Sequence, residues 1–295
     1  MTVKNIKLDG RSVPLREFDL NSMPENPSII MVAKRGSGKS WVCRSLLKHF
    51  KDIPGGVIIS PTDRMSSFYG EFFPELYIHY EYTSELIESI LYRQRQMIYK
   101  QKEKAKLGKR VDPRAILVMD DCLSSKGTWA TDPTFAEIMF NGRHYKIMYI
   151  MTMQFSLGIR PEMRGQVDVV MLLSEDFYSN QKRIYDHYAG IFPTFKAFRD
   201  VFMEVTADYG CMVLVNRGAS KDFLDKVFWY KAKNDSIDKM GSSQFNKFHE
   251  YNFNRDWGNP NMQRFNAVDY FSNKRDKFKV NKIGVGQEIT KEKPF

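Results

Sequence analysis

Cysteine is scarce in this 295-residue chain, which holds three, Cys43, Cys122 and Cys211, and no Cys-x-x-Cys pair. Cysteines so few and so widely spaced are not expected to form a disulfide framework or a zinc site, and a reducing compartment fits best. Long apolar runs are also missing, since the longest extend over about five residues, as in 29–33. A membrane span needs about 20 apolar residues, so an integral membrane protein is not expected. The polar start, 1–7, lacks the apolar core of a secretory signal, which argues against classical secretion.

Positive charge is what the chain has in excess. Its 45 Lys and Arg residues outnumber 35 Asp and Glu, which gives a net charge of +10 and a pI near 9.3. Hydrophobic residues make up 42% and charged residues 27%, a balance typical of globular rather than disordered proteins. The excess charge makes a polyanionic partner plausible but does not identify one.

Short apolar strands alternate with helical patterns from residue 29 to about residue 230. Buried strands are predicted at 29–33, 55–60, 115–119, 146–153, 167–173 and 211–215, with a further strand within 77–82. Helices are predicted after residue 40 and at 84–107, 133–143, 180–188 and 194–205. This order predicts an α/β fold in which helices flank both faces of a mostly parallel central sheet.

Composition divides the chain into three predicted regions. Residues 1–28 are expected to be an irregular N-terminal lead-in because they hold three prolines, and residues 29–232 are expected to form the core domain. In 233–295, a basic C-terminal appendage, apolar runs stop and aromatic residues occur singly. We expect this appendage to be extended or partly helical and to dock on the protein's own surface or on a neighbour. Stacking of its aromatics on nucleic-acid bases is the alternative.

The predicted helix at 84–107 and the residues just after it carry a lysine-rich stretch. Its cations are Lys100, Lys102, Lys104, Lys106, Lys109 and Arg110. Cations near a helix C-terminus complement the helix dipole, so a solvated helix end is the simpler interpretation. A surface that faces DNA is the alternative.

The strongest local signal is a phosphate-binding loop between the first buried strand and the helix after it. The loop reads Ala33, Lys34, Arg35, Gly36, Ser37, Gly38, Lys39 and Ser40. Its end matches the GxxxxGK[ST] pattern, although Ala33 stands where the first glycine is usual. The glycines let the backbone approach phosphate, and successive N–H groups form an anion nest at a helix N-terminus. The loop predicts a P-loop NTPase fold that binds ATP, with Lys39 at the β- and γ-phosphates and Ser40 on Mg²⁺.

Polar residues close two of the predicted strands. Asp120 follows the strand at 115–119, where an Mg²⁺-binding acid belongs, and Asp121 is placed to polarise an attacking water. For both, a role as a helix cap or turn residue is the alternative. Gln154 closes the strand at 146–153, at the sheet edge where ligands of α/β folds bind. It is expected to contact the γ-phosphate or to orient water, and a satisfied strand-end amide is its alternative role.

Arginine is the remaining catalytic candidate, because ring ATPases commonly need a cation at the transition state, from the same chain or a neighbour. The candidates are Arg35, Arg143, Arg160 and Arg164, each of which is singly more often a structural or surface residue. The five histidines form no ligand-spaced cluster, so no metal beyond Mg²⁺ is expected. No GxSxG nucleophile motif occurs.

The order of these motifs resembles a known family. Along 25–230 the chain reads AKRGSGKS, VIISPT, ILVMDDC, GRHYKIMYIMTMQ and LGIRPEMRGQVDVVMLL. This is similar to the poxvirus-type genome-packaging ATPases of large DNA viruses and virophages, within the FtsK–HerA superfamily. The resemblance implies a ring-forming motor that hydrolyses ATP and pumps double-stranded DNA, whatever its sequence, into a preformed capsid. Capsid or portal-vertex proteins are the implied partners, and the host cytoplasm, a viral factory or the virion the implied location.

The resemblance also assigns roles to single residues. It makes Lys39 and Ser40 the Walker A pair, and Asp120 and Asp121 the Walker B pair. Gln154 becomes the sensor-like residue. Arg164 matches an arginine that recurs in the family, whose role is less defined.

Two other functions stay open at this level. One is a DNA-pumping or helicase-type ATPase of the same superfamily outside packaging, although such proteins usually carry further domains for which 295 residues leave little room. The other is a nucleotide-binding assembly or scaffold protein without turnover. The intact residues Lys39, Ser40, Asp120 and Asp121 argue against the scaffold.

Overall fold

The computed structural model describes residues 3–8, 11–122, 131–154, 159–233 and 236–254. The chain forms two compact units, Met1–Phe253 and Asn254–Phe295, and the elements below belong to the first. The aromatic residues predicted to dock or to stack between 255 and 295 lie outside the described residues. The predicted division of the chain at residues 28 and 232 stays a prediction.

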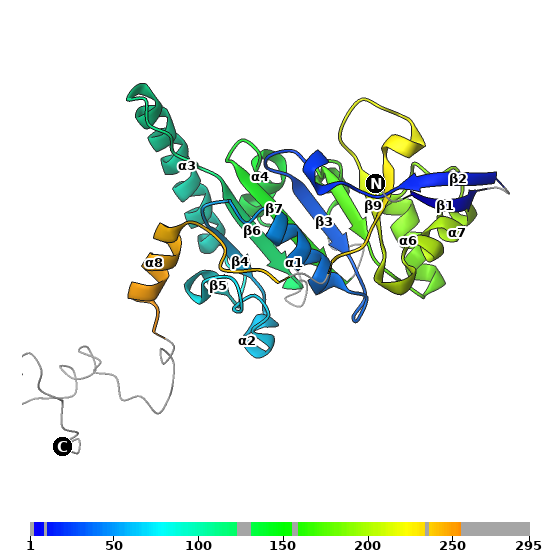
Figure 1. Ribbon diagram of the computed structural model, residues 1–295, viewed down its shortest axis with the longest axis horizontal. Helices are drawn as coiled ribbons and strands as arrows, with labels where there is room; N and C mark the ends of the chain where they lie inside the picture. The colour runs from blue at the N-terminus through cyan, green and yellow to red at the C-terminus, as the bar shows by residue number, and fades with distance from the viewer. Residues whose placement is uncertain (1–2, 9–10, 123–130, 155–158, 234–235, 255–295) are drawn as a thin grey trace, which may run out of the picture. The chain divides into compact units, whose positions relative to one another are not determined.

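Within the described ranges, a central sheet of eight strands has the order β10-β9-β8-β3-β7-β6-β4-β5 (Figure 1). The strands are β3 (Ser28–Val32), β4 (Gly56–Ile59), β5 (Ile78–His79), β6 (Ala115–Asp120), β7 (Ile147–Met153), β8 (Val169–Leu172), β9 (Cys211–Val215) and β10 (Val227–Tyr230). The strands from β8 to β5 are parallel, whereas β9 is antiparallel to both β8 and β10. The predicted α/β fold with a mostly parallel sheet is confirmed.

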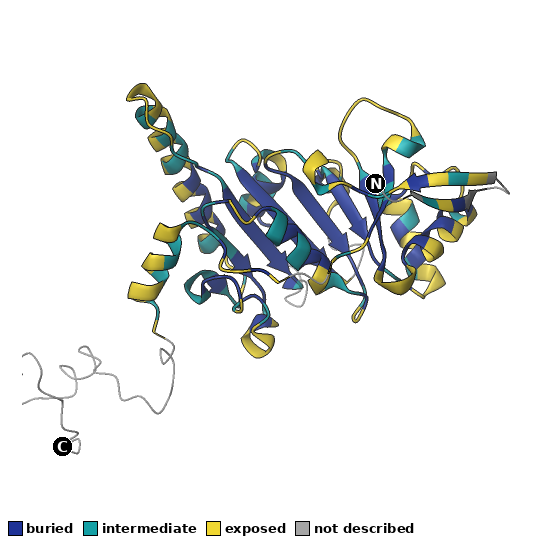
Figure 2. Ribbon diagram, viewed as in Figure 1, coloured by how far each residue is buried: buried dark blue, intermediate teal, exposed yellow. Residues whose placement is uncertain are grey.

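Helices cover both faces of this sheet, and apolar side chains form a core on each side. Figure 2 shows the strands of the sheet as its most buried part. One face carries α1 (Lys39–His49) and α8 (Ser243–Asn252), and the other carries α3 (Ser84–Lys106), α4 (Pro133–Asn141), α5 (Pro161–Arg164), α6 (Tyr178–Tyr188) and α7 (Phe195–Val205). The short helix α2 (Asp63–Ser66) follows β4. Short 3-10 turns occupy Leu20–Ser22, Glu75–Tyr77, Ala207–Tyr209 and Phe223–Asp225. Every residue of β3, β6 and β7 is buried. Burial on both faces explains why these strands read as continuous apolar runs instead of alternating patterns.

The predicted irregular lead-in is wrong at its start, where the chain forms a hairpin. Strands β1 (Val3–Leu8) and β2 (Arg11–Arg16) pair antiparallel in a separate two-stranded sheet. Ile6 and Leu15 are fully buried in the core that α7 and β10 share with this hairpin. Pro14 lies opposite Asn5, and a proline is tolerated there because a two-stranded sheet consists of edge strands.

The lysine-rich end of α3 is largely exposed, and Figure 1 shows this part of the helix extending past the sheet. Lys106 pairs with Glu103 at 2.7 Å on the same helix. This geometry fits a solvated helix end, and a DNA-facing role for these lysines stays a prediction. Among the described residues, no helix is both long enough and apolar enough to span a membrane.

The described start of the appendage is partly helical and packs on the body of the protein, as predicted. Its anchor is Phe245 of α8, which stacks on Tyr77 with 4.1 Å between ring centroids and meets Phe73 edge-on. The backbone N–H of Met240 donates to the carbonyl oxygen of Phe72 at 2.9 Å. Gly55 leaves the space that the Phe245 ring occupies, since a Cβ there would lie 2.8 Å from the ring.

We expect Phe245→Ala to release this docking segment. Removing the ring leaves a cavity beside Tyr77 and costs about 2 kcal/mol, below the range for fully buried phenylalanines because Phe245 is half-buried. Limited proteolysis should then cut faster between Lys233 and α8. Phe248→Ala on the same helix is the control, because that ring is 55% exposed. Equal protease resistance of the wild type and Phe245→Ala would contradict this anchor role.

Candidate active site

The loop between β3 and α1 has the backbone of an anion-binding turn. Gly36 and Gly38 have φ values of 74° and 93°, in the left-handed region that favours glycine. The Ser37 hydroxyl donates to the carbonyl oxygen of Lys34 at 2.7 Å and closes the turn. Helix α1 begins at Lys39, and the N–H groups of its first turn need partners from outside the helix.

Ala33 replaces the usual first glycine of the motif without a backbone penalty. It is buried, and its N–H donates to the carbonyl oxygen of Met153 at 3.0 Å, which extends the pairing of β3 with β7. Its φ is not positive, so this position does not require glycine. The departure from the pattern therefore leaves the loop intact.

A cavity of about 720 Å³ opens beside this loop. It is lined by Lys34, Arg35, Gly36, Gly38, Lys39, Ser40, Trp41, Val42, Thr62, Ser66, Phe68, Tyr69, Asp120, Asp121, Gln154, Tyr209, Lys231 and Ala232. The carboxyl ends of β3, β6 and β7 meet here, as expected for the ligand edge of a parallel α/β sheet.

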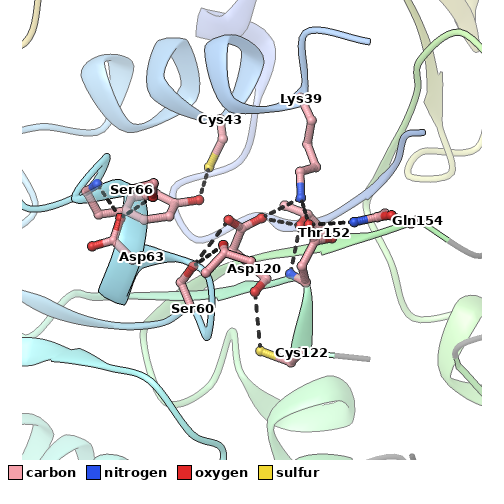
Figure 3. A network of polar contacts seen from close by, with 12 residues as sticks. Lys39, Cys43, Ser60, Asp63, Ser66, Asp120, Cys122, Thr152 and Gln154 are labelled. Atoms are coloured by element: carbon pink, nitrogen blue, oxygen red, sulfur yellow. Dashed lines mark hydrogen bonds and ion pairs between the residues drawn. The ribbon is translucent and has the colours of Figure 1, made fainter. Parts of the chain in front are cut away.

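A compact ion cluster lies in the cavity (Figure 3). The Lys39 ammonium is 3.0 Å from Asp120 Oδ1 and also contacts Asp121 Oδ2. The three side chains are largely buried, with exposed fractions of 13%, 10% and 14%. Burial lowers the pKa of Lys39, but attraction to Asp120 and hydrogen bonding to Asp121 outweigh it, so the pKa lies above its ordinary value. Lys39 is therefore a fixed positive charge at neutral pH.

Two hydroxyl groups that the sequence did not single out orient the Asp120 carboxylate. The Thr152 hydroxyl donates to Asp120 Oδ1, and it accepts from the backbone N–H of Asp121 at 3.2 Å. The Ser60 hydroxyl is 3.4 Å from Asp120 Oδ2. The available signal was a lone threonine in the otherwise apolar strand IMYIMTM, which the register places beside Asp120.

Asp121 is held in an unusual conformation that leaves one oxygen available. Its φ of 52° is left-handed, which costs a non-glycine residue about 1 kcal/mol or more. Gln154 Nε2 donates to Asp121 Oδ2 at 2.9 Å. Asp121 Oδ1 is buried and has no hydrogen-bond partner among the described residues. An acceptor of this kind is suited to a water molecule in the cavity.

The donors of the site fit Mg²⁺ bound together with a nucleotide. Ser40 and Asp120 offer oxygen donors, and Mg²⁺ typically takes one or two carboxylates with substrate phosphates and several waters. Across the described ranges, no group of three or more His, Cys, Asp or Glu could hold a metal alone. The site therefore suits a metal that arrives with phosphate rather than a metal centre built from protein ligands only.

The four candidate arginines do not meet at this site. Arg35 is exposed and lines the cavity. Arg143 precedes the amino end of β7, so it lies toward the sheet edge opposite the loop. Arg160 pairs with Glu162 on α5. Neither Arg143 nor Arg160 is part of the cavity lining.

Arg164 lies at the end of α5, outside the cavity lining. Its guanidinium stands over the ring of Tyr188 at 5.7 Å, and its Nη1 is buried without a hydrogen-bond partner in the described part of the chain. Burial raises the pKa of Tyr188 to about 12, although the Arg164 charge opposes this shift. Within one chain, Arg164 packs between helices and does not reach Lys39.

The fold and the loop define this chain as a P-loop NTPase. The family described as Poxvirus A32 protein matches residues 15–171. The chain is 47% identical over 244 residues to the protein named Uncharacterized protein L437 of Acanthamoeba polyphaga mimivirus, which covers 83% of this chain and 86% of that protein. It is 32% identical over 246 residues to Uncharacterized protein 088R of Invertebrate iridescent virus 3, and this alignment covers 79% of this chain and 90% of that protein. The chain belongs to the poxvirus A32 protein family, so the resemblance to poxvirus-type packaging ATPases is confirmed.

A solved structure shares the fold. The genome packaging NTPase B204 from Sulfolobus turreted icosahedral virus 2, in complex with sulfate, aligns with a TM-score of 0.50 and 16% identity. The alignment covers 72% of this chain and 100% of that chain. At this identity the likeness concerns the fold alone, and it agrees with the predicted P-loop NTPase architecture.

Proposed function

We propose that this chain hydrolyses ATP with Mg²⁺ and uses the energy to move double-stranded viral DNA into a preformed capsid, as a homo-oligomeric ring. The observation that carries the proposal is the contact of Lys39 with Asp120 and Asp121 beside a left-handed glycine loop. Membership of the poxvirus A32 protein family supports packaging as the task. Capsid or portal-vertex proteins are the proposed partners, and the site of virion assembly in host cytoplasm or viral factory the proposed location.

The motif residues of the cavity receive roles in hydrolysis. The backbone N–H groups of the loop 33–40 bind the phosphates. The Lys39 ammonium leaves the two carboxylates and contacts the β- and γ-phosphates. Ser40 and Asp120 would hold Mg²⁺, which would supply positive charge against the phosphates. Asp121 accepts a hydrogen bond from the attacking water through Oδ1. Gln154 donates a hydrogen bond to Asp121 Oδ2, so its position responds to a γ-phosphate bound beside Asp121.

The arginine that supplies positive charge to the transition state can come from the same chain or, in a ring, from a neighbouring subunit. Arg35 is the candidate from the same chain, since it lines the cavity. Arg143 and Arg164 lie away from their own cavity, so we propose that either acts on the site of a neighbouring subunit. A ring makes this arrangement possible because its active sites then lie at subunit interfaces.

A measurement of ATP turnover with and without DNA, together with the mass of the oligomer, tests the proposal. A packaging motor should hydrolyse ATP faster with DNA and assemble as a ring. An ATPase that ignores DNA contradicts translocation, and a ring without turnover indicates the scaffold alternative. A helicase-type enzyme would separate strands, which a pump for duplex DNA does not do.

Binding to double-stranded DNA should be independent of sequence and sensitive to salt. Contacts to backbone phosphates release counterions, so a ring that makes about six or more such contacts should lose about 10³-fold in affinity between 50 and 200 mM salt. Titration of two unrelated duplexes against the assembled oligomer measures this effect. Salt-independent binding, or no binding at low salt, would contradict the DNA-motor proposal.

A further inference from the structure

Strands β9 and β10, at one end of the sheet, bring two side chains to the cavity. The phosphate-binding motif requires neither of them. Strand β9 is antiparallel to β8, so its first residue lies at the edge where the parallel strands end. Strand β10 reverses direction again and ends at the same edge. Tyr209 before β9 and Lys231 after β10 therefore both line the cavity.

Tyr209 is presented by a strained turn. Asp208 and Tyr209 have successive φ values of 52° and 59°, a left-handed pair without glycine. The glycine of the turn is Gly210, where a Cβ would lie 2.0 Å from the carbonyl oxygen of Val205. Lys231 Nζ lies 2.5 Å from Asp208 Oδ2 and ties the turn to the end of β10. Such strain persists where surrounding contacts enforce it, and it is concentrated at ligand sites.

The Tyr209 ring lies directly on the phosphate loop. A Cβ at Gly38 would be 3.4 Å from Tyr209 Cδ1 and 3.6 Å from Tyr209 Cβ, which is ordinary contact distance. The side chain is nevertheless 63% exposed, although tyrosine usually buries most of its ring. The loop thus carries an open aromatic surface at its margin.

The strand order decides which end of a nucleotide would meet this surface. Asp121 and Gln154 follow β6 and β7, on one side of the loop-bearing strand β3, whereas β8, β9 and β10 lie on its other side. A triphosphate bound to the loop with its γ-phosphate at Asp121 therefore directs its base toward Tyr209.

We propose that Tyr209 is the base platform of this site, on which the purine of a nucleoside triphosphate stacks. Lys231 is a positioning residue that holds the Asp208–Tyr209 turn. The inference rests on the proposed ATP site, because it takes the orientation of the nucleotide from it. An aromatic platform favours the larger π-surface of purines over pyrimidines without reading their edges.

Equilibrium binding tests the platform without requiring turnover. In Tyr209→Ala the dissociation constant for ATP should rise about tenfold, which corresponds to about 1.4 kcal/mol. Tyr209→Phe should bind ATP like the wild type, because it keeps the ring. Inorganic tripolyphosphate, which has no base, should bind equally well to all three proteins. The wild type should also prefer ATP to UTP, and Tyr209→Ala should lose most of that preference.

Matched variants separate stacking from a structural role. Tyr99→Ala removes a tyrosine of similar exposure, 64%, on α3 and should bind ATP normally. Tyr209→Gly removes the ring and relieves the left-handed strain, so it should keep or raise the Tm while it weakens ATP binding. Lys231→Met should weaken ATP binding about threefold, with kcat at saturating ATP unchanged, and should add nothing to Tyr209→Ala.

Wild-type affinity of Tyr209→Ala for ATP would overturn the proposal, as would an equal loss of affinity for tripolyphosphate and ATP. Failure of the proposed hydrolysis is distinguishable, since it would appear as wild-type protein without turnover or as turnover that survives Lys39→Ala. The binding comparison remains decisive in that case.

Discussion

Lys39→Ala is expected to abolish ATP hydrolysis, with kcat/KM lowered by about 10³-fold or more. The ammonium is the only lysine charge that the described part of the chain places against both Asp120 and Asp121. Alanine removes the charge that would stabilise the transferring phosphoryl group. The loss of ATP hydrolysis is measured as phosphate release at saturating Mg²⁺ and ATP.

The same substitution should also lower the free energy of unfolding. Asp120 and Asp121 would lie largely buried without the Lys39 counter-ion, and breaking such a buried pair costs about 3 kcal/mol. Lys182→Ala is the control, because its pair with Asp186 is about half exposed and such pairs contribute little. Urea unfolding at neutral pH compares the two. An unchanged midpoint for Lys39→Ala would mean that the ion cluster does not support the fold.

Asp121→Asn is expected to stop turnover while nucleotide still binds. An amide cannot take the proton of the attacking water, and the loss of a general base costs about 10²- to 10⁴-fold in kcat. The loop 33–40, Lys39 and Asp120 remain, so the affinity for ATP should change by less than about fivefold. Single-turnover kinetics and equilibrium binding of ATP together make the distinction.

Asp186→Asn on α6 provides the matched control, since that carboxylate is exposed and lies outside the cavity lining. Its turnover should equal that of the wild type. Unchanged turnover in both Lys39→Ala and Asp121→Asn would refute the assignment of the site.

The sequence was sufficient for the parts of this fold in which local pattern and topology agree. Strands β3, β6 and β7 are buried on both faces, so their apolar runs marked them directly. Parallel strands end at a common edge, which made it possible to expect Asp120, Asp121 and Gln154 near the loop 33–40. The structure brings these residues together at hydrogen-bonding distances.

The rest depended on contacts that no local pattern encodes. Pro14 suggested an irregular segment, yet the hairpin is stabilised by burial of Ile6 and Leu15 against elements from the other end of the domain. The contact of Thr152 with Asp120 requires the register of β7 against β6. Tyr209 reaches the cavity only because β9 runs antiparallel, and strand direction cannot be read from five apolar residues.

The position of β3 in the sheet has a consequence for the order of folding. Among the described strands, this strand pairs with β7 and β8 alone, so residues 28–32 find their hydrogen-bonded neighbours at 147–153 and 169–172. During synthesis, the loop 33–40 thus leaves the ribosome long before either neighbour exists. Closing such long-range pairs is slow, and the nascent chain exposes an apolar strand meanwhile. Competence to bind a nucleotide should therefore arise late, only after translation has passed residue 172.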